Sequence, residues 1–444
     1  MPLITPRTLK GFRDHLPESM LQREQLIDTA RCVYQSYGFS PIDTPALEYE
    51  EILLGKGSEE TDKQVYCFED HGGRRVGLRF DLTVPLARFS AQHIGELGTP
   101  LKRYQIAPVW RGENTQKGRY REFVQCDFDT IGTKSIIADI EIALVIHDLF
   151  IALGCESFKI HINNRKILTG LLSSLGIEDQ TVTMLRCLDK LSKVSREKVA
   201  EEMLATEGIK KEEVASLLAL TEIMGTSEEV LKETQSLVTG NAVFSAGINE
   251  LTQLVHGLAA AGVPDSRVHL DLSIARGLDY YTGSIFETFL DALPEIGSVC
   301  SGGRYDHLAE TYTKTELPGV GASLGLDRLL AAMQEIGALE GTPIAADILI
   351  VYFDPERSDD YLQLARQLRL SGLRVEMYVE PKKIGQQLKY ANRRGHRLAV
   401  IAGSEELEQG VCQIKDLHTG VAEQVSLQGG YDTLVRALKQ KLAD

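Results

Sequence analysis

The chain has 444 residues, a formal net charge of −15 at pH 7, and a composition of 43% hydrophobic and 25% charged residues. These values are typical of a water-soluble folded protein, and the length predicts about three domains. No apolar run approaches the roughly 20 residues of a membrane-spanning helix, and the acidic balance excludes non-specific coating of nucleic acid. A specific RNA site stays compatible with this charge, because a local basic patch can coexist with an acidic whole.

The seven cysteines are scattered without a Cys-x-x-Cys pair, so neither a disulfide framework nor a zinc ribbon is indicated. No histidine pair at ligand spacing appears either, and we expect no metal held by the protein alone. The N-terminal stretch lacks the hydrophobic core of a signal peptide. We therefore expect a reduced, cytoplasmic protein without a membrane segment.

The first part of the chain has a mixed pattern of helices and strands. Its expected elements are a helix over 18–37, an extended segment over 39–47, strands over 65–68 and 77–82, and a helix over 83–94.

The segment 109–131, VWRGENTQKGRYREFVQCDFDTI, has the pattern of a β-hairpin with a polar turn. Strand side chains alternate between two faces, so Val124, Cys126 and Phe128 are expected in the core. The opposite face then carries Phe123, Gln125, Asp127 and Asp129, with Arg119 and Arg121 upstream and Arg111 on the partner strand. Such a face can hold a charged ligand, although an ordinary solvated hairpin has the same pattern.

Helical periodicity without prolines sets 172–262 apart as a separate helical insertion. The flanking sequence predicts a helix over 136–153 and strands over 158–162, 268–273 and 283–289, then a glycine-rich segment at 319–325 and a helix over 326–336. After a linker at 337–345, strands and helices alternate, which predicts a compact α/β domain with a mostly parallel sheet.

Three further segments carry polar groups suited to a ligand. In 79–83, Asp81 and Thr83 are expected on one face of a strand, although Asp81 could equally cap a helix. Arg276, Tyr280 and Tyr281 lie between two strands, and Arg328 begins a helix after the glycine-rich segment, where it could meet a phosphate. One competing motif, Gly-x-Ser-x-Gly around Ser323, fits the nucleophile elbow of a serine hydrolase, but Pro318 interrupts the strand that should lead into it.

Four motifs stand out along the chain: WRGENTQKGRYREF, GVGASLGLDRL, ARGLDYYTG and SGGRYD. By these motifs the chain resembles the histidyl-tRNA synthetases, a family of class II aminoacyl-tRNA synthetases, over essentially its whole length. The resemblance implies an α+β fold with an antiparallel-sheet catalytic domain over 1–171 and 263–336. It also implies a helical insertion over 172–262 and a C-terminal α/β anticodon-binding domain over 346–444.

The implied activity is that of a ligase, which joins histidine to ATP as histidyl-adenylate and then transfers histidine to the 3′ end of tRNA(His). The nucleophile of the first step is the substrate's own ionised carboxylate, so the protein must supply positioning and charge neutralisation. The resemblance also implies Mg²⁺ bridging the phosphates and a homodimer.

The family's site residues map onto this sequence position by position. Arg111 and Arg276 would serve the reacting phosphate and the histidine carboxylate. The other contacts implied are Asp81, Thr83, Gln125, Asp129, Tyr280 and Tyr281 for histidine, and Glu113, Arg119, Phe123 and Arg328 for ATP. The candidate contacts for tRNA come from charge: Lys382, Lys383, Lys389, Arg393 and Arg394 belong to the most basic run of the C-terminal domain, which ends at Arg397. A solvated helix face has the same pattern.

Two alternatives stay open on the sequence. One is a histidine-sensing paralogue of the type that forms the regulatory subunit of ATP phosphoribosyltransferase. That subunit lacks an anticodon domain, whereas this chain continues for about 100 residues beyond the linker. The other is the serine hydrolase built on Ser323, with His396 or His418 as its base.

Overall fold

The computed structural model describes residues 3–55, 62–116, 118–192, 194–274, 280–339 and 344–443. The chain divides into a larger unit, Met1–Asp14 with Arg23–Leu339, and a smaller unit, His15–Gln22 with Glu340–Asp444. The predicted α+β class is confirmed, because the larger unit combines helices with a largely antiparallel eight-stranded sheet and the smaller unit has a five-stranded sheet. Among the described residues, no helix is long and apolar enough to cross a membrane.

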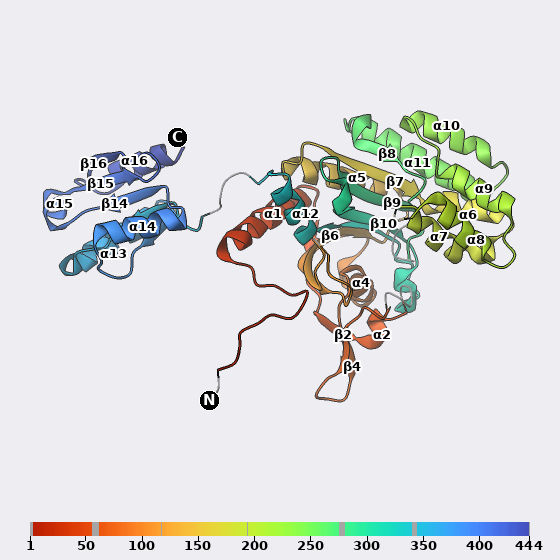
Figure 1. The fold of residues 1–444 in the computed structure, drawn as a ribbon, viewed down its shortest axis with the longest axis horizontal. Helices are drawn as coiled ribbons and strands as arrows, with labels where there is room; N and C mark the ends of the chain where they lie inside the picture. The colour runs from red at the N-terminus through yellow and green to blue at the C-terminus, as the bar shows by residue number, and fades with distance from the viewer. Residues whose placement is uncertain are drawn as a thin grey trace. The chain divides into compact units, whose positions relative to one another are not determined.

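The first half of the chain supplies one edge and the centre of the large sheet (Figure 1). Its elements are α1 (Pro17–Ser36), β1 (Ser40–Pro41), β2 (Leu47–Tyr49), α2 (Glu50–Leu53), β3 (Cys67–Glu69), β4 (Arg75–Leu78), α4 (Thr83–Leu97), β5 (Leu101–Trp110), β6 (Glu122–Ile131), α5 (Ile136–Ala152) and β7 (Phe158–Asn164). The predicted hairpin is present as the antiparallel pair β5–β6.

A helical segment and four more strands complete this unit. They are α6 (Arg165–Ser174), α7 (Thr181–Asp189), α8 (Arg196–Leu204), α9 (Lys211–Leu220), α10 (Ser227–Leu237), α11 (Ala242–Ala260), β8 (Val268–Leu270), β9 (Ser284–Leu290), β10 (Cys300–Tyr305), β11 (Gly319–Gly325) and α12 (Leu326–Glu335). The strand order is β1-β5-β6-β11-β10-β9-β7-β8, with a separate three-stranded sheet β2-β4-β3.

The two faces of the large sheet differ in chemistry. Cys126 and Phe128 of β6 are fully buried in a hydrophobic cluster with residues of α1 and α5, as the alternation predicted. Directly paired residues share a face of a sheet, and their register traces a polar row across the opposite face. This row consists of Gln105, Asp127, Ser323, Ser301, Glu287, His161 and His269.

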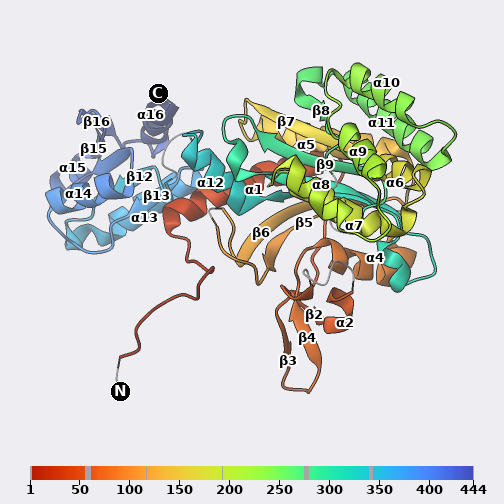
Figure 2. The ribbon, with the colours of Figure 1, turned by 45° about the vertical axis from the view of Figure 1, so that its right-hand side comes forward.

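The helical segment begins at Arg165, earlier than the expected 172, because Asn164 at the end of β7 caps α6 by accepting a hydrogen bond from the Lys166 amide (3.0 Å). Its apolar residues belong to the same hydrophobic cluster as α1 and α5. The contact is close: a Cβ at Gly257 of α11 would lie 2.6 Å from Ile140 Cδ1 of α5. The segment therefore shares a core with the sheet layer, and its helices gather beside β7 and β8 in both ribbon views (Figures 1 and 2).

The strand expected over 77–82 ends at Leu78. Asp81 Oδ1 accepts a hydrogen bond from the Val84 amide (3.0 Å), which starts α4 at Thr83 instead of extending β4. Helix capping thus outweighs strand alternation at this position.

The smaller unit has strand order β13-β12-β14-β15-β16. Its elements are β12 (Ile348–Ile350), α13 (Ser358–Leu370), β13 (Val375–Met377), α14 (Ile384–Arg394), β14 (Leu398–Ile401), α15 (Ser404–Gln409), β15 (Val411–Asp416), β16 (Ala422–Ser426) and α16 (Asp432–Ala443). Strand β12 pairs in parallel with β13 and β14, whereas β15 and β16 are antiparallel. The sheet is thus mixed, where a mostly parallel one was expected, and α15 was not foreseen.

Asp327 links the N-terminal segment to the sheet. Its carboxylate, 2% exposed, forms ion pairs with Arg13 and Arg23 and accepts a hydrogen bond from the Val124 amide (2.9 Å). One buried carboxylate therefore balances two guanidinium groups.

We expect Asp327→Asn to lower the free energy of unfolding by about 3 to 5 kcal/mol, because it leaves two guanidinium groups without their counter-charge. Urea unfolding followed by the fluorescence of Trp110, the chain's single tryptophan, measures this. Glu316→Gln, which breaks an exposed ion pair with Lys134, is the matched control and should leave the midpoint unchanged. Equal effects of the two changes would contradict the role given to Asp327.

Candidate active site

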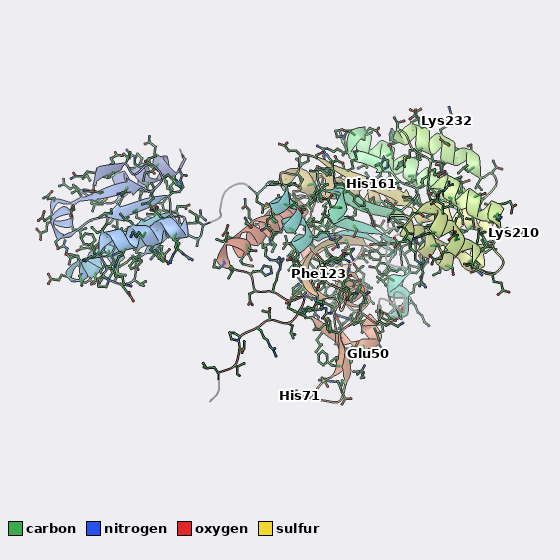
Figure 3. The ribbon with its side chains drawn as sticks, viewed as in Figure 1. Glu50, His71, Phe123, His161, Lys210 and Lys232 are labelled. Atoms are coloured by element: carbon green, nitrogen blue, oxygen red, sulfur yellow. The ribbon has the colours of Figure 1, made fainter. Side chains whose placement is uncertain are left out.

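A cavity of about 110 Å³ lies over β6 at the end that carries Phe123, which Figure 3 labels. Its lining includes all five residues predicted to bind ATP: Arg111, Glu113, Arg119, Phe123 and Arg328. They come from β6, from the chain between β5 and β6, and from α12, so segments distant in sequence converge here as expected.

Arg111 is held in a fixed position within this cavity. Its Nε donates to the Phe80 carbonyl (3.2 Å), and its guanidinium carbon lies 4.3 Å from the Phe80 ring centroid and 5.1 Å from that of Phe123. Burial lowers the pKa of Arg111, with Asp81 acting in the opposite direction. An arginine side chain remains charged under such conditions, so the group is an oriented cation.

Arg328 and Arg119 supply two more cations. Arg328 Nη1 donates to the Ser298 carbonyl (2.6 Å), which fixes this side chain in the first turn of α12. Arg119 Nη1 lies 3.5 Å from Glu113 Oε2. Three guanidinium groups around one small cavity give it the charge that a polyphosphate requires.

Next to this cavity, the residues predicted to bind histidine form a second, acidic group. Asp81 Oδ2 accepts from the Tyr280 hydroxyl (3.4 Å), and the Tyr280 and Tyr281 rings meet edge to face at 5.2 Å. Burial raises the pKa of Asp81, while the Val84 amide and Arg111 lower it. Thr83 also contacts Tyr280.

Asp129 belongs to this acidic group and is 3% exposed. Its Oδ2 lies 2.7 Å from Nη2 of the fully buried Arg103, and its Oδ1 accepts from the Tyr305 hydroxyl. Burial raises the pKa of Asp129, and Arg103 and Tyr305 lower it. The structure thus assigns Asp129 two partners that sequence reasoning missed.

Asp127 and Gln125 present acceptors that lack a partner among the described residues. Gln125 Nε2 donates to Ser323 Oγ (2.8 Å), which leaves Gln125 Oε1 and Asp127 Oδ1 buried without a hydrogen bond. Burial raises the pKa of Asp127 to about 7, against the effect of Arg103. Buried acceptors are ordinarily satisfied, so this pair is suited to a ligand that donates hydrogen bonds and carries positive charge.

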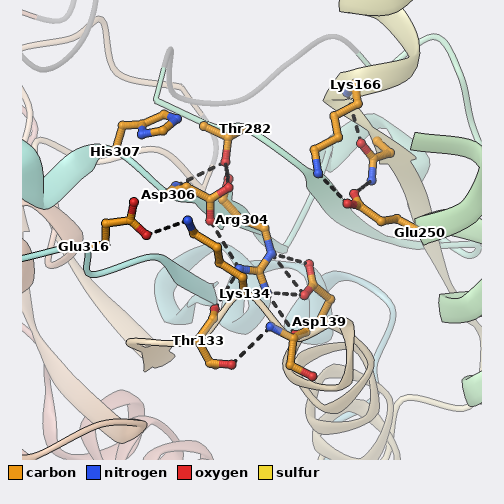
Figure 4. Close-up of polar contacts among 12 residues, drawn as sticks. Thr133, Lys134, Asp139, Lys166, Glu250, Thr282, Arg304, Asp306, His307 and Glu316 are labelled. Atoms are coloured by element: carbon orange, nitrogen blue, oxygen red, sulfur yellow. Dashed lines mark hydrogen bonds and ion pairs between the residues drawn. The ribbon is translucent and has the colours of Figure 1, made fainter. Parts of the chain in front are cut away.

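The loop that carries Tyr281 is tied to the sheet by Arg304 (Figure 4). Arg304 forms a buried ion pair with Asp139 of α5, and its Nη1 donates to the Thr133 carbonyl (3.0 Å). The Arg304 carbonyl accepts from the Thr282 amide (2.8 Å), and the Thr282 hydroxyl donates to Asp306 (2.8 Å). The same network therefore anchors α5, β10 and the chain next to Tyr281.

Of the predicted site residues, only Arg276 falls in 275–279, outside the described residues. Asp127, Tyr305 and Arg103 extend the predicted set. Alternation had placed Asp127 on the ligand face, and Tyr305 lies in the quoted motif SGGRYD. The sequence offered no comparable signal for Arg103.

The hydrolase motif is not a nucleophile elbow. Ser323 lies within β11, paired with Ser301 and Asp127, and its hydroxyl oxygen accepts from Gln125. An elbow requires the serine on a sharp turn between strand and helix, whereas here the strand continues to Gly325.

In the smaller unit, Lys389 and Arg393 lie one turn apart on the exposed face of α14, opposite the buried Gln387 and Ala391. The other predicted tRNA contacts, Lys382, Lys383 and Arg394, are also exposed. Arg397 has a structural role instead, because it donates to the Leu442 and Lys441 carbonyls (2.6 and 3.1 Å) at the end of α16.

Known proteins resemble the chain along its whole length. A family model described as histidyl-tRNA synthetase matches residues 11–329, and one for the anticodon binding domain matches 347–437. The histidine–tRNA ligase of Rhodopirellula baltica is 58% identical over 98% of this chain and 99% of that protein. That of Wolinella succinogenes is 46% identical over 94% and 95%.

Solved structures agree with this assignment. The histidyl-tRNA synthetase of Nostoc sp. PCC 7120 superposes with a TM-score of 0.88 at 37% identity, covering 99% of this chain and all of that one. A Bacillus halodurans structure described as ATP phosphoribosyltransferase regulatory subunit/histidyl-tRNA synthetase shares the fold at 24% identity and a TM-score of 0.77. The matched anticodon-binding domain makes the regulatory-subunit alternative the less supported one. The chain therefore belongs to the histidyl-tRNA synthetase family, as its motifs predicted.

Proposed function

We propose that the two adjoining sites over β6 activate histidine with ATP and that the product is transferred to tRNA(His). Ligase activity follows from family membership. The observation that carries the residue assignment is the convergence of Arg111, Arg119 and Arg328 on one cavity beside the acidic group of Asp81, Asp127 and Asp129. Cations on one side and carboxylates on the other match ATP and the ammonium group of an amino acid.

In the first step, an oxygen of the histidine carboxylate attacks the α-phosphorus of ATP, the bond to the bridging oxygen breaks, and pyrophosphate leaves with its electron pair. No protein base is needed, because the carboxylate is already ionised. Arg111 lies between the two sites and would neutralise the charge that develops on the α-phosphate. Arg119 and Arg328 would hold the distal phosphates, and Phe123 would stack on adenine.

Histidine recognition would use the acidic group. Asp81, Thr83, Gln125 and Asp127 would surround the α-ammonium group, whose hydrogen bonds the orphaned oxygens of Gln125 and Asp127 can accept. Asp129, with Tyr280, Tyr281 and Tyr305 nearby, would read the imidazole nitrogens. A site with buried polar partners rejects an analogue that lacks them by a factor on the order of 10⁴ to 10⁵.

Mg²⁺ would be held largely by the phosphate oxygens of ATP, as is usual for this ion. The residues present fit it: Glu113 lines the cavity, and its Oε2 lies 3.5 Å from Arg119 Nη1, so it can contribute a carboxylate oxygen. When bound, Mg²⁺ offsets phosphate charge. Arg276 stays a predicted second contact to the histidine carboxylate.

A homodimer in the cytoplasm completes the proposal. The homodimer is supported by an apolar surface on the three-stranded sheet β2-β4-β3, where Leu47, Tyr49 and Phe68 are 40 to 51% exposed. Tyr49 and Phe68 are both paired with Val76 of the central strand, so they share one face.

Pyrophosphate–ATP exchange without tRNA tests the proposal, and we expect exchange only when histidine is present. Asp129→Asn should raise the KM for histidine about 10- to 100-fold with little change for ATP, because it removes a charge-assisted contact worth about 1.5 to 3 kcal/mol. Arg328→Ala should instead raise the KM for ATP, with little change in the KM for histidine. Absence of histidine-dependent exchange would refute the function, whereas equal shifts in both KM values would refute only the assignment of residues.

Asp127 predicts a pH dependence of stability. Its pKa of about 7 in the folded chain exceeds the ordinary value of 3.8. Between these two pH values, Asp127 is therefore protonated in the folded state and ionised in the unfolded state. Stability from this group is therefore lost as pH rises from about 4 to 7. The gain from Asp127→Asn should be larger at pH 8 than at pH 5 by about 1 to 4 kcal/mol.

Urea unfolding at the two pH values measures this difference, with Asp43→Asn, an exposed carboxylate, as the matched control. Saturating histidine should reduce the difference, because the bound ammonium favours the ionised carboxylate. A pH-independent effect of Asp127→Asn would contradict the assignment.

The exposed face of α14 gives a prediction for tRNA. The double change Lys389→Ala with Arg393→Ala should raise the KM for tRNA in aminoacylation and leave exchange unchanged. The salt dependence of tRNA binding should weaken by about one unit of slope per lost phosphate contact. The control is Arg436→Ala with Lys439→Ala, an exposed pair on α16. An equal rise in the KM for tRNA in this control would show that overall charge, and not the exposed face of α14, determines tRNA binding.

A further inference from the structure

At the far end of the polar row from Asp127, three metal-ligating side chains come together. His161 of β7 and His269 of β8 are directly paired in parallel strands, and Asp271 follows β8. One ligand atom from each of the three lies within 4.8 Å of the others. Four strand spacings of about 4.8 Å separate His161 from Asp127, so this cluster lies roughly 19 Å along the row from the acidic group.

The carboxylate of Asp271 is oriented by the residues around it. Its Oδ1 accepts hydrogen bonds from the Ser273 amide (3.0 Å) and the Ser273 hydroxyl (2.5 Å), which turns Oδ2 toward His161 Nδ1 at 2.9 Å. The Asp271 amide donates to the Ile162 carbonyl (3.0 Å), fixing the backbone against β7. A ligand carboxylate held by a second layer of hydrogen bonds is a usual feature of metal sites.

The imidazole of His269 has a ring contact with His161, at 4.6 Å between centroids, and no hydrogen bond to any other described residue. Two imidazoles and a carboxylate thus meet with one hydrogen bond among them, between His161 and Asp271. Ligand atoms around one tetrahedral zinc ion are about 3.3 Å apart, so a modest rotation of the His269 or His161 ring would close the cluster on an ion.

The cluster is accessible. The side chains of His161 and Asp271 are about one-fifth exposed, and Figure 3 labels His161 on the large sheet beside the helical segment. Asp271 also lines a cavity of about 600 Å³ between the sheet and the helical segment, together with Ser273, Glu287, Phe289, Leu188 and Leu191. Asp271 contributes negative charge to the lining of this cavity, and Arg119, which also lines the cavity over β6, contributes positive charge.

We propose that His161, His269 and Asp271 form a binding site for a divalent transition-metal ion of the zinc type. Imidazole ligands select such ions over Mg²⁺ and Ca²⁺, which prefer oxygen. Three protein ligands leave a fourth coordination position open. The sequence predicted no metal held by the protein alone, so this proposal departs from that prediction. The proposal does not rest on the proposed ligase activity.

Zinc titration of the full chain tests the site. Protein stripped with a chelator and desalted is titrated with Zn²⁺ in competition with a chromophoric chelator. We expect one equivalent to bind, with affinity at least about tenfold weaker in His269→Gln and in Asp271→Asn. His71→Gln is the matched control, since His71 lies at the tip of the β3–β4 hairpin, away from the large sheet (Figure 3).

Circular dichroism of each variant shows whether it is folded, and the visible absorption of bound Co²⁺ reports tetrahedral coordination in the wild type. Zinc bound equally by the wild type and both cluster variants would place the ion elsewhere, for example on Cys32 or Cys67, and would overturn the proposal. Failure of the wild type to bind one equivalent would overturn it as well.

Discussion

The arrangement of the site depends on the burial of negative charge on one face of the large sheet. Asp81, Asp127 and Asp129 are 2 to 3% exposed, and an isolated buried carboxylate is expensive. Arg103 reaches this group from the neighbouring strand, and Arg111 borders it. The compensation is incomplete, because the pKa of all three carboxyl groups remains raised. The folded chain therefore carries a deficit of positive charge at the position where we place the ammonium group of histidine, so binding should relieve an electrostatic cost of folding.

Much of this site follows from local sequence rules. A period of two along β6 separates Phe123, Gln125, Asp127 and Asp129 from the core residues Cys126 and Phe128, because strand pleating depends only on neighbouring residues. The antiparallel pairing of β5 with β6 follows from the polar turn between them. These rules and the four motifs predicted which residues meet around the cavity.

Other features could not be derived from the sequence, because they depend on the pairing of strands distant along the chain. Asp129 meets Tyr305, 176 positions away, and His161 meets Asp271, 110 positions away. Local competition explains two other differences. The Asp81 side chain bonds to the Val84 amide, and the strand expected over 77–82 ends at Leu78, although helix α4 begins at Thr83 as predicted. The Asn164 side chain bonds to the Lys166 amide and starts α6 ahead of residue 172.

The connection between β7 and β8 has a consequence for how the chain folds. These strands are parallel neighbours, and the whole helical segment, about 100 residues, joins them, so bringing them together closes a long loop. Pairs of this kind form slowly, because chain entropy is lost before distant contacts can offset it. The helices α6 to α11 can acquire much of their structure from nearby contacts. We therefore expect β8 to join the sheet late, which would leave the edge of β7 exposed on intermediates during synthesis.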